Sequence, residues 1–118
     1  MQEVYIVSVA RTPIGSLGGV LSGVTAVELG KIAVQAAMER AGVNGTQIDE
    51  VYMGNVLQAN VGQAPAQQVS IAAGIATTTP CTTVNKVCSS GMKAIMLGAQ
   101  SIMLGDNQVV VVGGMESM

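Results

Sequence analysis

The chain has 118 residues, with 5 Lys and Arg against 7 Asp and Glu, so only 10% of its residues carry charge. This length fits one domain with one core, and an ordinary soluble domain has about 25% charged residues, so we expect much of the surface to face other protein. The net charge is −2 and two Tyr are the only aromatic residues, which leaves neither the basic stripe nor the stacking platform of a nucleic-acid binder.

The sequence also bears on membrane, targeting and disulfide questions. The longest uncharged run, Val51 to Asn85, is broken by amide side chains and two prolines, so no bilayer-spanning segment is expected. The N-terminal Met-Gln-Glu-Val has neither a basic n-region nor an Arg-rich leader, which predicts a cytoplasmic location. Cys81 and Cys88, if joined by extended chain, would lie about 23 Å apart against a limit near 7 Å, so reduced thiols are expected.

The first part of the chain predicts a strand followed by a helix. Val4 to Ala10 is a short, β-branched apolar run closed by Arg11-Thr12-Pro13, which predicts a buried strand that enters a glycine-rich loop. Thr25 and Glu28 form a capping box before an apolar segment, and Gly42 stands where a C′ glycine would end it. A helix is therefore predicted at about 26–41. Its polar residues form one narrow stripe, which predicts that the helix is nearly buried.

The middle of the chain predicts a second strand and a second helix. Val51 to Leu57 is apolar and follows the turn signal Asn44-Gly45, which favours a strand. Pro65 near the start and Gly74 past the end bracket a helix.

The last part repeats this alternation. Thr82 to Val87 is β-branched and predicts a third strand. Apolar residues recur at helical spacing from Met92 to Met103, which predicts a helix at about 90–104 whose methionines fill the core. Val109 to Val112 predicts a fourth strand, followed by two glycines.

The predicted order β-α-β-α-β-α-β, with short connections, is typical of an α/β domain. Such an order favours a mixed, mostly parallel sheet with right-handed crossovers and with helices on at least one face. The chain stops four residues after Gly114, at the mouth of the last predicted strand, with no closing element. We therefore expect a chain that is cut rather than finished.

Composition removes several kinds of active site. The chain has no histidine, so neither a His-dependent triad nor a His metal site can be built within it. Two cysteines seven residues apart match no zinc pattern, so no metal is expected. The glycine cluster Gly15 to Gly19 lacks the spacing of a dinucleotide loop, and Ser89 and Ser90 lack a nucleophile-elbow motif, so a loop and helix N-caps are favoured.

Cys88 is the candidate nucleophile. It falls at the end of the third predicted strand and directly before the helix that Ser89-Ser90-Gly91 opens. Ligands of open α/β sheets bind outside the carboxyl ends of the strands, and the positive end of a helix dipole favours the thiolate form of a thiol. A lone cysteine is also among the most often buried residue types, so on these residues alone core packing remains the alternative for Cys88. Cys81 lacks the helix terminus, and core packing is favoured for it.

Four segments then carry a family resemblance. Asn85 to Ala94 and Gly113 to Met118 resemble the nucleophile region and the following strand of thiolases, closest to the biosynthetic acetyl-CoA acetyltransferases. Val7 to Gly15 and Met53 to Leu57 are similar to the same family, in the right order. The resemblance covers residues 1–118. It implies the first half of a five-layer α-β-α-β-α fold, a partial N-terminal domain without the loop domain and the C-terminal domain.

The resemblance also implies a chemistry. Cys88 would take the acyl group from acyl-CoA as a thioester, in the reversible Claisen condensation of two acetyl-CoA to acetoacetyl-CoA and CoA. Coenzyme A is then the carrier, and no metal or redox cofactor is implied. In the family the activating His, a second Cys that moves the α-proton and an Asn-held water come from the second half, and most coenzyme A contacts come from the loop domain. No residue here is assigned to coenzyme A binding, and no turnover is expected of the 118 residues alone.

An alternative from another class is a non-catalytic fragment that acts as a binding or scaffolding subunit, because sparse charge fits either interpretation. The resemblance implies a homo-oligomer, dimer or tetramer, or a second chain that carries the missing His and Cys. Asn55 and Gln63 lie in a polar segment that resembles a family subunit contact. Structural roles are favoured for Arg11, Lys86, Lys93 and Met115.

Overall fold

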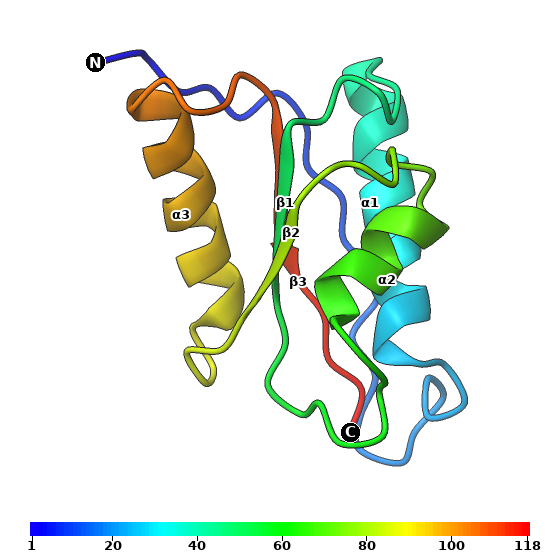
Figure 1. Ribbon diagram of the computed structural model, residues 1–118. Helices are drawn as coiled ribbons and strands as arrows, with labels where there is room; N and C mark the ends of the chain where they lie inside the picture. Colours follow the sequence, from blue (N-terminus) through cyan, green and yellow to red (C-terminus); the bar gives the residue numbers. More distant parts are fainter.

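The computed structural model describes residues 1–118 and contains three helices and three strands. In chain order these are α1 (Ala26–Ala41), β1 (Glu50–Gly54), α2 (Pro65–Ala72), β2 (Cys81–Val84), α3 (Ser90–Met103) and β3 (Val110–Gly114) (Figure 1). None of the three helices has the length and hydropathy that a membrane span requires.

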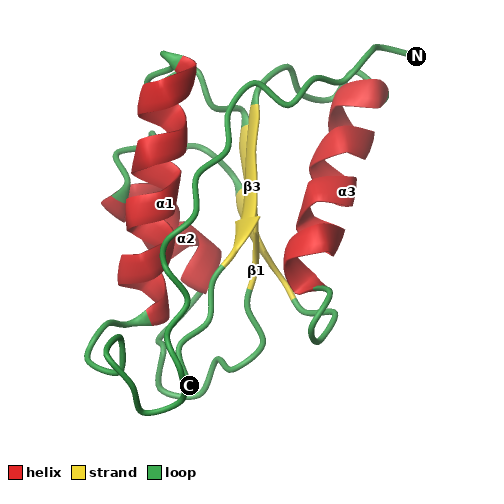
Figure 2. Cartoon of the chain, turned by 180° about the vertical axis from the view of Figure 1, so that it is seen from behind, coloured by secondary structure: helices red, strands yellow, loops and turns green.

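The three strands form one parallel sheet in the order β2-β1-β3. Val51 of the central strand pairs with Cys81 on one side and with Val111 on the other. The carboxyl ends of all three strands therefore lie side by side at one edge of the sheet. Helices α1 and α2 cover one face and α3 covers the other, so the α/β class and the parallel pairing are confirmed (Figure 2).

The predicted first strand is wrong. Residues 4–10 run as extended chain from the end of α3, where the N–H of Gln2 donates to the carbonyl of Met103, toward the end of α1 (Figures 1 and 2). The only hydrogen bond to their backbone comes from Arg40 Nη1, which donates to the carbonyl of Val9 at 2.8 Å. The large apolar side chains of this segment, from Tyr5 to Val9, are 72% to 77% exposed. A strand needs a neighbour to exchange backbone hydrogen bonds with, and no strand of this chain lies in that position.

Helix α1 has the predicted bounds because both of its ends are capped by local residues. Thr25 Oγ1 accepts the N–H of Glu28 at 3.1 Å, and Glu28 Oε2 accepts the N–H of Thr25 at 2.9 Å. Gly42 takes the left-handed conformation, at φ 69°, which ends the helix. The expectation of a nearly buried helix is wrong, since only every fourth residue from Ala26 to Met38 is buried and Ile32 is 53% exposed. One side of α1 packs on α2 and the core, and the other remains open.

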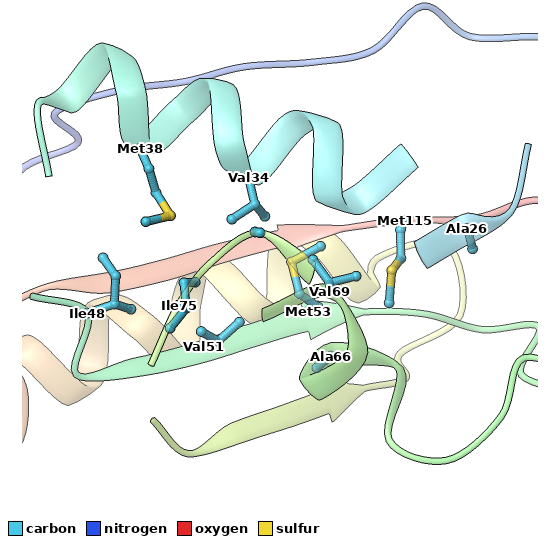
Figure 3. Packing of buried hydrophobic residues seen from close by; sticks show 11 residues of the cluster. Ala26, Val34, Met38, Ile48, Val51, Met53, Ala66, Val69, Ile75 and Met115 are labelled. Carbon is cyan, nitrogen blue, oxygen red and sulfur yellow. The ribbon is translucent and has the colours of Figure 1, made fainter. Parts of the chain in front are cut away.

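The hydrophobic core lies between the sheet and the α1–α2 layer. Side chains from β1, among them Val51 and Met53, point toward Val34, Met38 and Val69 of the two helices (Figure 3). Met115, just after β3, is also part of this cluster, which confirms the packing role expected for it.

Helix α3 approaches the opposite face of the sheet through small residues. Its buried residues include Ala94 and Gly98, and a Cβ added at Gly98 would lie 2.3 Å from Cγ1 of Val112. The methionines expected in the core instead point away from the sheet, with Met92 68% and Met96 48% exposed. The apolar spacing predicted the helix correctly, but the close face is the one with the small side chains.

Candidate functional site

The carboxyl edge of the sheet gathers the residues of interest. Asn55 follows β1, and Glu116 lies two residues beyond the end of β3. A short loop, residues 85–89, follows β2 and leads into α3. This loop contains Cys88 and is referred to below as the Cys88 loop.

Cys88 lies on the surface directly before Ser89, the N-cap residue of α3. Its backbone N–H donates no hydrogen bond within the chain. Core packing is therefore not the role of Cys88, because its side chain is exposed. Cys81 is half-buried against the core, and its thiol donates to the carbonyl of Thr79 at 3.4 Å; both cysteines are free thiols.

The Cys88 loop is held by its own polar groups. The side chain of Asn85 accepts the N–H of Val87 at 3.0 Å. The hydroxyl of Ser90 accepts the N–H of Lys86 at 2.8 Å and donates to the carbonyl of Val87 at 2.6 Å. The expected side-chain capping by these serines is wrong, since Ser89 makes no capping bond and Ser90 ties the loop together instead.

Val87 has a strained backbone next to the candidate nucleophile. Its φ of 50° lies in the left-handed region, which is a genuine outlier for a β-branched residue. Such strain costs about 1–3 kcal/mol and persists only where surrounding contacts enforce it. The hydrogen bonds from Asn85 and Ser90 supply that enforcement.

The first turn of α3 presents unpaired donors beside Cys88. The N–H groups of Gly91 and Met92 have no acceptor within the chain, and this turn contains no acidic residue. Unpaired N–H groups and the helix dipole make this end of α3 electropositive, which favours an anion such as a thiolate or an oxyanion. Lys86 is exposed and Lys93 is half-buried, and neither side chain makes a hydrogen bond here.

Three glycines let α3 begin directly on the sheet. A Cβ at Gly54 would lie 2.5 Å from the carbonyl carbon of Ser90 and 2.7 Å from the nitrogen of Gly91. A Cβ at Gly114 would lie 3.2 Å from the Cα of Gly91. The start of α3 therefore rests on the main chain of β1 and β3, with no side chain between them. The sequence interpretation missed this contact, although a glycine inside one predicted strand (Gly54) and two glycines after another (Gly113 and Gly114) were the available signal.

Asn55 and Glu116 join the ends of β1 and β3. Asn55 is 1% exposed, and its Nδ2 donates to the carbonyl of Met115 and to Glu116 Oε2, both at 3.1 Å. The carboxylate of Glu116 also accepts the N–H of Val56 at 3.1 Å and of Leu57 at 2.9 Å. The side chain of Asn55 is therefore buried inside the chain and used within it, whereas a subunit contact of the polar segment around it stays a prediction. Gln63 is exposed, and so is Arg11.

Other features lie away from Cys88. A cleft of about 410 Å³ lies between the start of α1, residues 59–61 and Ser117, and Cys88 does not line it. Backbone N–H groups of Val109 and Gln108 lower the pKa of Asp49, and burial raises the pKa of Tyr52. No group of three or more His, Cys, Asp or Glu gathers to hold a metal ion.

Comparison with known proteins gives one consistent family. Residues 4–118 match the family described as thiolase, N-terminal domain. The mitochondrial acetyl-CoA acetyltransferase of Xenopus tropicalis is 62% identical over all 118 residues, which cover 28% of that relative. The cytosolic acetyl-CoA acetyltransferase ERG10 of Gibberella zeae is 60% identical, with 30% of its length covered.

A solved structure agrees. The Acat5 thiolase of Ascaris suum, crystallised in complex with coenzyme A, superposes with a TM-score of 0.94 at 45% identity. The match covers 96% of this chain and 30% of that one. The chain thus spans less than a third of the relatives it matches.

The predicted cytoplasmic location is contradicted by these relatives. The similar acetyl-CoA acetyltransferases of Xenopus tropicalis, Bos taurus and Homo sapiens are mitochondrial, whereas the one from Gibberella zeae is cytosolic. Similar sequences therefore serve both compartments.

Proposed function

The chain belongs to the thiolase family, and from that premise we propose that it carries the nucleophile of an acyl-transfer site, with Cys88 as the residue that accepts the acyl group. The observation that carries the proposal is the position of Cys88. It is exposed, its backbone N–H is unpaired, and it stands directly before the electropositive end of α3 at the carboxyl edge of the sheet.

The acylation step follows from this position. The Cys88 thiolate attacks the carbonyl carbon of an acyl-CoA thioester, so that a bond from Sγ to carbon forms. The carbon–sulfur bond to coenzyme A then breaks, and coenzyme A leaves as its thiolate. Charge develops on the carbonyl oxygen during the attack, and an unpaired backbone N–H such as that of Cys88 is the kind of donor that stabilises it.

The full reaction that we propose is the reversible condensation of two acetyl-CoA to acetoacetyl-CoA and CoA. It needs a base for the thiol proton and a group that removes the α-proton of the second acetyl-CoA. We assign both to residues outside this chain, in a C-terminal domain or in another chain of a homo-oligomer or a mixed assembly. The 118 residues alone are then acylated at most once and do not turn over.

A second candidate function is a non-catalytic binding or scaffolding subunit. The exposed apolar face of α3, with Met92 and Met96, favours it, because such a face needs another protein surface over it. The two functions differ in what they require of Cys88. Only the enzyme requires a reactive thiol.

The experiment compares the alkylation of both cysteines by iodoacetamide near pH 7, in the folded chain and in concentrated urea. Peptide mass spectrometry follows each residue separately, and Cys81→Ser and Cys88→Ser confirm the assignments. If Cys88 is the nucleophile, it reacts faster in the folded chain than in urea, whereas half-buried Cys81 reacts more slowly when folded. The unfolded reference removes the trivial effect of exposure. A Cys88 that reacts no faster when folded would overturn the catalytic assignment.

A further inference from the structure

The bonds between Asn55 and Glu116 form a clasp at the edge that carries Cys88. This Glu116 clasp consists of the Glu116 carboxylate, the Asn55 side chain and the N–H groups of Val56 and Leu57. Its residues are some 60 positions apart in sequence, and its hydrogen bonds are 2.9 to 3.2 Å long. Asn55 Nδ2 faces two acceptors, so the orientation of this amide is fixed by its partners.

The chemistry of the clasp calls for a carboxylate. Every partner of the Glu116 side chain is an N–H donor: two backbone groups and one side-chain amide. An ionised carboxylate only accepts, whereas the glutamine amide has one oxygen and an NH₂ group that would face those donors. Hydrogen bonds to a charged acceptor are also about twice as strong as neutral ones.

The clasp reaches α3 through backbone contacts. Gly54 directly precedes Asn55, and Gly114 lies two residues before Glu116. These two glycines are the ones on which the first turn of α3 rests, and the N–H of Met115 also donates to the carbonyl of Gly54 at 2.9 Å. Because main chain touches main chain, a shift between the ends of β1 and β3 passes to the helix start without a flexible side chain to absorb it.

We propose that Glu116 is a positioning residue for Cys88: it fixes the ends of β1 and β3, and through Gly54 and Gly114 it sets where the electropositive start of α3 stands relative to the thiol. The inference rests on the proposed function, in which Cys88 is the nucleophile. Glu116 itself touches no reacting atom in this assignment. Its effect is on the ease with which Cys88 ionises and reacts.

The test is the pH profile of Cys88 alkylation in the chain and in Glu116→Gln. The matched control is Glu28→Gln, because Glu28 is a second glutamate whose carboxylate accepts a backbone N–H, in the cap of α1. Thermal unfolding of each variant reports its stability. Lys86 and Lys93, the charged side chains of the Cys88 loop and of the first turn of α3, are unchanged in both.

We expect Glu116→Gln to slow Cys88 alkylation at pH 7 by about two- to fivefold, the scale of a charge interacting with a helix terminus, and to move the profile to higher pH. Loss of the negative charge by itself would move the profile to lower pH, so the direction of the shift separates the positioning effect from the direct effect of the charge. Glu28→Gln lowers the unfolding temperature but leaves the Cys88 profile in place, because a purely structural role does not move it. Glu116→Asp, which keeps the charge with a shorter reach, shifts the profile in the same direction by less.

The outcomes separate this inference from the proposed function. An unchanged profile in Glu116→Gln, with Cys88 of the parent chain still faster when folded, overturns the positioning role and leaves the nucleophile in place. If Cys88 of the parent chain reacts no faster when folded than in urea, the proposed function and the positioning role of Glu116 are both overturned. Should Glu116→Gln fail to fold, Glu116→Asp decides, and a parent-like profile there overturns the positioning role.

Discussion

The hydroxyl of Ser90 donates to the carbonyl of Val87 at 2.6 Å across the loop that contains Cys88. The same hydroxyl accepts the N–H of Lys86, and Ser90 is only 5% exposed. A serine that belongs to the first turn of α3 thus secures the residue before the candidate nucleophile in its left-handed conformation. The geometry of Cys88 depends on this hydrogen-bonded loop as well as on the helix behind it.

Replacement of Ser90 by alanine should destabilise the chain. The change leaves the Lys86 N–H without its acceptor in a partly buried place, which costs about 1–3 kcal/mol. The Val87 carbonyl loses the hydroxyl but keeps the backbone N–H of Ser90 at 3.1 Å. Urea unfolding measures the loss. Ser89→Ala is the control, because Ser89 is exposed and makes no capping bond, so a change within about 0.5 kcal/mol is expected. Equal losses in the two variants would contradict the role given to Ser90.

Val87→Gly should stabilise the chain. Glycine relieves about 1–2 kcal/mol of left-handed strain, and its added freedom in the unfolded chain returns about 0.5–1 kcal/mol of that. Val87 is 66% exposed, so little packing is lost. Val20→Gly is the comparison: Val20 is 94% exposed without a positive φ, and only the entropic loss remains. Urea unfolding should therefore give opposite signs for the two variants, and a loss in Val87→Gly would show that the strain is absent.

Gly98→Ala should destabilise the chain by about 1–2 kcal/mol. Overpacking against Val112 costs about 1–3 kcal/mol, and the better helix propensity of alanine recovers up to about 1 kcal/mol. Gly23→Ala serves as the control, because its Cβ would meet nothing within 4 Å and its φ is not positive. Thermal unfolding of both variants gives the comparison. A stable Gly98→Ala variant would mean that α3 stands farther from the sheet than described.

Asp49→Asn should weaken the chain near neutral pH and have less effect in acid. The N–H groups of Val109 and Gln108 hydrogen-bond the carboxylate and lower the pKa of Asp49 in the folded chain. The stability that the Asp49 carboxylate contributes is therefore complete above its ordinary pKa of 3.8. It is lost as the pH falls through the lower pKa that Asp49 has in the folded chain.

The measurement is urea unfolding of parent and Asp49→Asn between pH 7 and pH 2, with Asp106→Asn as the control. Asp106 is exposed and its carboxylate accepts no hydrogen bond, so no such pH-dependent difference is expected for it. A constant gap between the parent chain and Asp49→Asn across this range would exclude the hydrogen-bonded carboxylate as the cause.

How far the sequence predicted the fold depended on whether the determining contacts were local. Helix α1 was predicted with its observed bounds because Thr25, Glu28 and Gly42 cap it within a few residues. The strand at residues 4–10 was predicted wrongly because a strand depends on a partner, and no β-branched run reveals whether the chain supplies one. The wrong face of α3 was predicted to be buried, because the large apolar methionines favoured that side as the core. The sequence does not show that Gly98 allows the helix to approach Val112 closely on the other side.

The candidate site divided in the same way. Cys88 was found from its place between a strand and a helix, and its role as nucleophile remains a prediction. The clasp of Asn55 and Glu116 was not found, because its two sides meet only when β1 and β3 pair. A capping role, which is common for serine, was predicted for Ser90. The left-handed conformation of Val87, which Ser90 holds by a hydrogen bond, could not be foreseen from residue types.

The strand order β2-β1-β3 leaves the outer edge of β3 without a partner. Most of this edge is formed by four consecutive valines, Val109 to Val112, and contains neither a charged residue nor a proline that would discourage association. An open, uncharged, β-branched edge is a template on which further strands add, and repeated addition leads to fibrils. We therefore expect self-association of the chain at high concentration to begin by strand pairing along the outer edge of β3.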